Sequence, residues 1–160
     1  MDKNNLAFTL IELIVTLSII LIFVTLTLPN FNIYSQQLKL KNDAQKFVDI
    51  FELAKKKAIT SDLYDQSCSQ FNGYRITLDA NSYILKFGCA GVYQNIQTYN
   101  FDPNNTSITG VGDFDFPPLG LNINLSISAI RFKNTAINQC IDISVSRIGI
   151  ININNSLVSC

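Results

Sequence analysis

The spacing of apolar residues changes twice along this 160-residue chain. Over residues 8–28 nearly every position is apolar or carries a hydroxyl, and Glu12 is the one charged residue. Over residues 40–58 apolar positions recur at alternating steps of four and three, the spacing of one face of an amphipathic helix. From residue 68 onward, short β-like runs alternate with Gly, Pro, Asn, Asp and Ser. The pattern predicts one long N-terminal helix followed by a β-rich domain.

The first apolar stretch is long enough to cross a membrane. A helix of about 21 residues rises about 32 Å, and a hydrocarbon core is about 30 Å thick. Its Thr and Ser hydroxyls can bond to carbonyls one turn earlier, so they do not oppose a span. The run is longer than the apolar region of a cleaved signal peptide, and Leu28-Pro29-Asn30-Phe31 is a poor cleavage site. We therefore expect residues 8–29 to form a transmembrane helix, with a kink near Pro29 where the apolar run ends.

Glu12 is the unusual residue of this stretch. A carboxylate in a membrane span costs roughly 3 kcal/mol or more and by default marks a functional position. It lies four residues after Phe8, so it is expected near one membrane face and not at the centre of the bilayer. An ordinary membrane anchor would not explain it.

The sequence FTLIELIV at residues 8–15 resembles the N-terminal motif of type IV pilins and type II secretion pseudopilins. The resemblance implies that a prepilin peptidase removes a leader of residues 1–7, cutting between Ala7 and Phe8, and methylates the new amino group of Phe8. It also implies that Glu12 pairs with that amine in the growing filament, and that Pro29 is the helix-kinking proline of many pilins. Ala7 departs from the family, which usually has Gly there.

The second half of the predicted helix has one apolar face. We expect the helix to run from about Phe8 to about Ile59, with the lysines at 55–57 solvated at its C-terminal end, where cations suit the helix dipole. The expected organisation is a leader at 1–7, a span at 8–29, an amphipathic continuation at 30–62 and a periplasmic domain at 63–160. The residues of the apolar face are Leu40, Ala44, Phe47, Phe51, Ala54 and Ala58.

The rest of the chain predicts antiparallel strands. Tyr74–Leu78 and Tyr83–Phe87 flank a turn signal at 79–82 and should form a hairpin. We expect an α+β fold in which the apolar helix face covers the sheet. Further strands are predicted at 92–101, 114–116, 121–127 with a possible continuation at 130–132, 141–146, and 150–154 after a turn at 147–149.

Two C-terminal stretches resemble the minor pseudopilins of the GspH/FimT type. FDFPPLG at residues 114–120 looks like that family's Phe-x-Pro-x-Gly stretch. ISVSRIG at residues 143–149 looks like its final hairpin. The resemblance implies a minor pilin or pseudopilin, which is a structural and interaction subunit and not an enzyme.

Four cysteines follow the predicted span, and an even number in an exported domain suggests disulfides. Turns centred near residues 80–81 and 148 would bring each local pair of cysteines together. We therefore expect the two hairpin-bracketing bonds, with four reduced and separately buried thiols as the alternative. The expected bonds are Cys68–Cys89 and Cys140–Cys160.

Composition excludes several kinds of chemistry. There is no histidine, no nucleophile motif and no phosphate-binding loop, so we expect no catalytic residues, no cofactor and no metal. Asp113 and Asp115 lack the further oxygen ligands of a calcium site. Lys+Arg equals Asp+Glu, so no net charge attracts nucleic acid.

DNA binding is nevertheless the alternative that the resemblance raises, because some FimT-like pilins bind DNA near the C-terminal hairpin. Here Arg147, with Arg131 and Lys133, makes a thin basic patch, and phosphate affinity scales with the number of cations engaged. A second alternative is a membrane-anchored periplasmic domain that never assembles. The favoured partners are other pilins through the N-terminal helix, the prepilin peptidase and the bacterial inner membrane.

Overall fold

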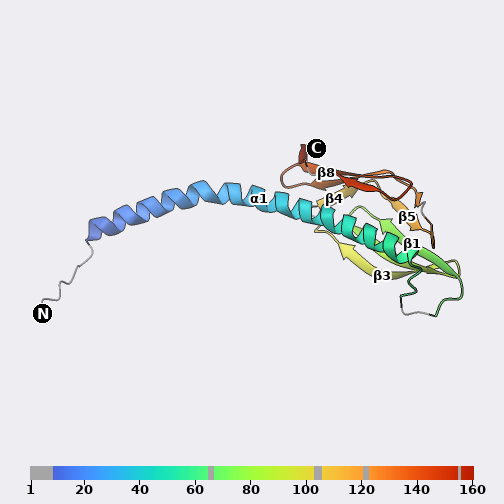
Figure 1. Cartoon of the computed structure of the whole chain (residues 1–160). Helices are drawn as coiled ribbons and strands as arrows, with labels where there is room; N and C mark the ends of the chain where they lie inside the picture. The colour runs from blue at the N-terminus through green and yellow to red at the C-terminus, as the bar shows by residue number, and fades with distance from the viewer. Residues whose placement is uncertain (1–8, 65–66, 103–105, 121–122, 155) are drawn as a thin grey trace, which may run out of the picture. The chain divides into compact units, whose positions relative to one another are not determined.

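The computed structural model of the chain (Figure 1) describes residues 9–64, 67–102, 106–120, 123–154 and 156–160, with no side-chain description for 26–30. One helix, α1 (Leu10–Ile59), precedes all the strands. The class is α+β with antiparallel sheets, as predicted. The strands are β1 (Phe71–Leu78), β2 (Ser82–Cys89), β3 (Val92–Asn100), β4 (Thr106–Thr109), β5 (Gly112–Phe116), β6 (Asn124–Leu125), β7 (Ala129–Asn134), β8 (Gln139–Val145), β9 (Ile151–Ile153) and β10 (Val158–Ser159).

The chain divides into two compact units, Met1–Ser35 and Gln36–Cys160. In the first unit the apolar side chains of α1 point to solvent, as they must in a lone helix that is apolar on all sides. In the second unit the six predicted face residues of α1 are all buried, with at most 1% of their surface exposed. The helical periodicity therefore identified the core-facing side of α1 correctly.

The second unit contains two five-stranded sheets, where the sequence analysis expected one. The first sheet has the order β3-β2-β1-β5-β6, and the second has the order β10-β8-β7-β4 with β9 also pairing with β8. The C-terminal part of α1 lies alongside these strands (Figure 1). The ring of Phe47 contacts Tyr83 of the first sheet at 5.4 Å between centroids and Phe132 of the second at 5.8 Å. One helix face thus packs against both sheets and holds them in a single core.

The predicted strand at 121–127 is the main error. Only Asn124–Leu125 forms a strand, β6, and residues 121–122 lie outside the described residues. The segment at 130–132 does not continue it but belongs to β7 in the second sheet. The chain changes sheets between them: Ser126 N–H donates to Asp113 O of β5, and Val145 N–H of β8 donates to Ser128 O. The alternating apolar residues therefore face one core from two sheets in turn.

The two hairpin turns lie where the sequence placed them. Leu78 pairs with Tyr83, which centres the first turn between residues 80 and 81, and Ile143 pairs with Ile153, which centres the last at 148. A register shift before Gly73 sets Cys89 opposite Phe71. Gly73 has φ +94°, and an added Cβ would lie 1.9 Å from a backbone oxygen of β5, so only glycine fits this bulge.

Both expected disulfides are present. Cys68 and Cys89 are bonded with their Cα atoms 5.9 Å apart, and Cys140 and Cys160 with theirs 5.5 Å apart. The first bond ties the loop after α1 to the end of β2, and the second ties the C-terminus to β8 beside the β8–β10 pairing. Each bond closes a local loop, as the hairpin turns required.

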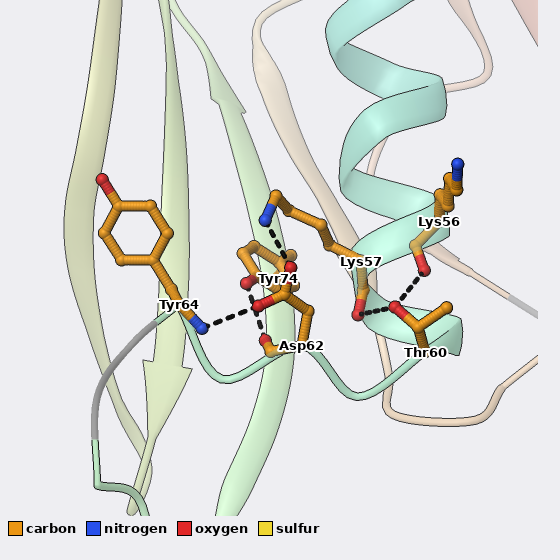
Figure 2. A network of polar contacts seen from close by, with 6 residues as sticks. All are labelled: Lys56, Lys57, Thr60, Asp62, Tyr64 and Tyr74. Carbon is orange, nitrogen blue, oxygen red and sulfur yellow. Dashed lines mark hydrogen bonds and ion pairs between the residues drawn. The ribbon is translucent and has the colours of Figure 1, made fainter.

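A network of polar contacts connects the last turn of α1 to the residues that follow it (Figure 2). Asp62 is its centre: its carboxylate accepts hydrogen bonds from the Lys57 ammonium and from the Tyr64 N–H at 2.9 Å. Its backbone carbonyl accepts from the Tyr74 hydroxyl of β1 at 2.7 Å. The Lys57 contact is the main cause that lowers the pKa of Asp62 below its ordinary value. This network joins the helix end to the first sheet.

The lysines at the helix end were expected to be simply solvated, and this is wrong for two of the three. Lys57 pairs with Asp62, and Lys55 donates to the carbonyl of Gly149 at 2.7 Å. Lys56 is exposed as expected. The sequence pattern could not show these partners because both lie beyond the helix.

Candidate functional site

The candidate site is the beginning of α1, where the predicted assembly residue Glu12 lies in the first helical turn. Thr9 directly precedes the helix. The Thr9 backbone N–H and hydroxyl both donate to Glu12 Oε2, at 3.2 and 3.1 Å, and the Glu12 N–H lies 3.4 Å from Thr9 Oγ1. This reciprocal arrangement is a capping box, which satisfies donors that a helix N-terminus otherwise leaves free.

The capping role of Glu12 was missed in the sequence analysis. Its signal was available, because Thr-x-x-Glu before an apolar run is the sequence form of a capping box. The geometry turns the carboxylate back toward the start of the helix, where the helix dipole favours negative charge. Both residues are exposed, so the carboxylate remains open to a further donor. Ala7 and Phe8, the predicted cleavage and methylation residues, lie outside the described residues.

From residue 13 to residue 25 the surface of α1 is mainly apolar and exposed. The hydroxyls of Thr16, Ser18 and Thr25 donate to carbonyls three or four residues earlier, at 2.8–2.9 Å, as the sequence analysis expected of hydroxyls in lipid. These three hydroxyls are thus satisfied within the helix, and the exposed surface around them is formed by apolar side chains. The predicted kink residue Pro29 lies among residues 26–30, whose side chains are not described.

A membrane span was expected at residues 8–29. Over the part of the chain that the structure describes, no helix combines the length and the apolar character needed to cross a membrane.

Of the three cations considered for DNA binding, Arg131 is held in an ion pair. Arg131 makes a two-point ion pair with Asp142 of the neighbouring strand β8, with Nε 2.6 Å and Nη2 3.0 Å from the carboxylate. This pairing lowers the pKa of Asp142. Lys133 lies two residues further along β7, and Arg147 is exposed in the turn after β8. A cation already held by a carboxylate contributes little to phosphate binding.

Asp113 and Asp115 of β5 also have a partner. Arg75 of β1 donates two hydrogen bonds to Asp115 and lies 3.6 Å from Asp113. The Arg75 guanidinium is 4.0 Å from the centre of the Tyr93 ring. Both acids therefore form ion pairs with Arg75 on the first sheet. Among the described residues, no group of three or more potential metal ligands is found.

Comparison with known families gives one match. Residues 2–28 match the model of the prokaryotic N-terminal methylation motif, which is consistent with a type IV pilin-like protein. The match covers most of the expected leader, the capping box and the first apolar part of α1, and it ends before the first strand. Neither the curated proteins nor the solved structures contain a match to this chain.

Proposed function

We propose that this chain is a minor pilin or pseudopilin, a structural and interaction subunit of a type II secretion pseudopilus or type IV pilus. The observation that carries the proposal is the methylation motif at residues 2–28, with Glu12 at the third position of the helix that follows. In this reading a prepilin peptidase cuts between Ala7 and Phe8 and methylates Phe8. The C-terminal stretches that resemble GspH/FimT-type minor pseudopilins support the finer assignment.

The arrangement of the chain fits this role. The helix up to residue 35 offers an apolar surface to lipid before assembly and to neighbouring helices afterwards. The compact unit from Gln36 onward carries two disulfides, which persist in oxidising compartments such as the periplasm. We infer an inner-membrane precursor with a periplasmic C-terminal domain, whose partners are other pilins.

Glu12 would act as a registry residue in the filament. A carboxylate packed among apolar helices without a counter-charge is costly, so packing favours the position where a neighbour's N-terminal amine meets it. Within its own chain, Glu12 already accepts from the Thr9 N–H, one residue after Phe8. The neighbour's amine would therefore be received at the helix N-terminus.

Mass spectrometry of the membrane-extracted chain tests the proposal. In cells with a working prepilin peptidase, the mature chain should begin at N-methyl-Phe8. Cells without the peptidase are the control and should contain only the precursor that begins at Met1. Ala7→Gly restores the residue that the family usually has and should increase the processed fraction.

An intact precursor in cells with active peptidase would exclude processing and favour the alternative of a non-assembling anchored domain. If the Ala7→Gly variant also remains unprocessed, the presence of alanine instead of glycine at position 7 does not explain the lack of cleavage. Processing without cross-links to partner pilins would leave the motif intact but refute the assembly role.

A further inference from the structure

The strand β3 is an unusual sheet edge. Among the described residues it pairs with β2 on one side and forms the outer edge of the first sheet on the other. It is nine residues long, whereas the strands at the other sheet edges, β6, β4, β9 and β10, have two to four residues. Short edge strands are one way in which proteins prevent unwanted pairing, and β3 does not use it.

The composition of β3 also lacks the residues that usually prevent another strand from pairing with a sheet edge. Its sequence VYQNIQTYN contains no charge and no proline, which are the residues that normally block strand addition. A register shift opposite Leu85 and Lys86 interrupts β3 between Asn95 and Gln97. Because a bulge can deter pairing, the regular segment at residues 97–100 is the part of the edge suited to adding a strand. Six of its nine residues are exposed, and the three half-buried ones are Tyr93, Ile96 and Tyr99.

The backbone of β3 is held ready for pairing. The Tyr99 ring stacks on the buried Tyr83 at 4.7 Å, and the Tyr93 ring contacts Arg75 at 4.0 Å. The Phe101 N–H donates to Asn81 O, so the alternation of an antiparallel ladder turns the N–H and C=O of Thr98 and Asn100 away from β2. A rigid strand with outward-facing backbone groups loses little entropy when another strand adds to it.

From these observations we propose that β3 pairs, antiparallel, with β3 of a second copy of this chain. Four of its residues are amides, Gln94, Asn95, Gln97 and Asn100, and each amide carries both donors and acceptors. Such a strand complements its own copy, whereas a charged strand would repel it. Antiparallel pairing of identical strands also satisfies a two-fold axis, the commonest symmetry of homodimers.

The second copy is favoured over a charged peptide because the edge offers no charge to select one. One strand pair buries less than the roughly 1,200 Å² of a standard interface, so the pairing is expected to be weak in dilute solution. Concentration of the chain in a membrane or filament would strengthen it. The inference does not depend on processing at Phe8, so its failure and that of the proposed function are distinguishable.

Cysteine cross-linking of the full-length chain in detergent tests the inference. All four native cysteines are in disulfides, so a short bismaleimide reacts only with an introduced thiol. Thr98→Cys on β3 should give a cross-linked dimer. The matched control is Ser144→Cys, which is exposed on β8, a strand with neighbours on both edges, and should give at least about tenfold less dimer.

Charge reversal within β3 then tests whether the partner is the same strand. In the Thr98→Cys background, Gln97→Lys and Gln97→Glu should each reduce the dimer about tenfold. A cross-link between the two copies of Thr98 places the two copies of the adjacent, exposed residue 97 about 7 Å apart along the strands, so like charges there lie within one Debye length. Mixing the two variants should restore it. Matching thermal melts of both variants and the parent would show that the fold is kept.

Equal cross-linking of Thr98→Cys and Ser144→Cys would overturn the proposal. So would charge variants that dimerise as well as the parent, or a mixture that cross-links no better than either variant alone. Dimers that form only through α1 would show this insensitivity to the β3 charges, because the apolar helix is unchanged in every variant.

Discussion

The ammonium of Lys55 donates a hydrogen bond to the backbone carbonyl of Gly149 at 2.7 Å. The two residues are 94 positions apart, and the contact joins the last turns of α1 to the turn between β8 and β9. Gly149 has φ +72°, and its missing Cβ leaves room for the lysine, whose Cε would lie 3.1 Å from a side chain there. Helix and final hairpin are thus connected by a polar contact as well as by the core.

Lys55→Ala should destabilise the β-rich unit. The bond is part-buried and its donor is charged, so its loss is expected to cost about 1–2 kcal/mol and lower Tm by about 2–6 °C. The measurement is thermal unfolding of the full chain in detergent followed by circular dichroism. Lys56→Ala is the matched control, because Lys56 is exposed, and should change Tm little. Equal effects of the two changes would show that the contact with Gly149 has no stabilising role.

The buried hydroxyl of Tyr74 should make the folded state less stable at alkaline pH. Burial raises the pKa of its hydroxyl from 10.0 to about 12, because the buried site disfavours the charged form. The folded state then keeps a proton that the unfolded chain loses, so this contribution is complete below pH 10 and is lost as the pH rises from 10 to about 12.

The test compares urea unfolding of the wild type and Tyr74→Phe between pH 8 and 12. Below pH 10 the variant should be less stable by about 1 kcal/mol, because Asp62 O loses its donor. The difference should shrink, or reverse, toward pH 12. A difference that does not vary with pH would mean that Tyr74 ionises equally easily in the folded and unfolded states.

Much of this fold could be predicted from local patterns. The steps of four and three identified the buried face of α1, and the turn signals placed both hairpin centres. Those centres also favoured the local cysteine pairs, and the expected bonds Cys68–Cys89 and Cys140–Cys160 are both present. Local pattern was sufficient wherever the partner was the next element along the chain.

The remaining features depend on distant partners. Residues Ser126 to Ser128 change sheets through bonds to Asp113 and Val145, and alternation alone cannot distinguish two sheets that share a core. Arg131 was expected in a thin basic patch with Arg147 and Lys133, but the pairing of β7 with β8 places it opposite Asp142, with which it forms an ion pair. At the candidate site, the role of Glu12 in capping was visible in the Thr9-x-x-Glu12 spacing but was obscured by the family resemblance.

The two disulfides should contribute comparably to stability. Their sequence separations are 21 and 20, and the loop-entropy model gives about 3 kcal/mol for loops of this size. Removing one bond as a double Cys→Ser variant should lower the free energy of unfolding by about that amount, measured by urea unfolding. Reduction with dithiothreitol should lower the wild type further than either double variant. An unchanged midpoint after reduction would mean that the core alone sustains the fold.

Asp43 on α1 should limit stability at neutral pH. Desolvation raises its pKa, partly offset by the hydrogen bond from the buried Thr106 hydroxyl at 3.1 Å. Since the folded state favours the protonated form, this residue's contribution falls as the pH rises from 3.8 through the folded pKa. Asp43→Asn keeps a hydrogen-bond acceptor for Thr106 without the charge.

Asp43→Asn should therefore stabilise the protein at pH 7 and give a smaller gain near pH 4. Thermal unfolding at several pH values measures the difference. Asp49→Asn is the control, because Asp49 is exposed on the same helix, where its carboxylate accepts a hydrogen bond from Gln45. A gain that is the same at both pH values would contradict the assigned burial effect.

Glu12 combines two functions that substitutions can separate. Glu12→Gln keeps an oxygen that can accept from the Thr9 N–H, because Gln also serves in a capping box, but it removes the charge. Glu12→Ala removes both. Loss of the cap should cost about 1 kcal/mol of local helix stability, so hydrogen exchange at the start of α1 should be faster only in the Ala variant.

Assembly should respond to charge instead. Both variants should insert in the membrane at least as well as the wild type, since a costly carboxylate is removed. Both should also cross-link less to partner pilins, because neither can pair with a neighbour's N-terminal amine. If Glu12→Gln assembles normally while Glu12→Ala does not, the residue acts in assembly through the helix cap, and its charge has no registry role.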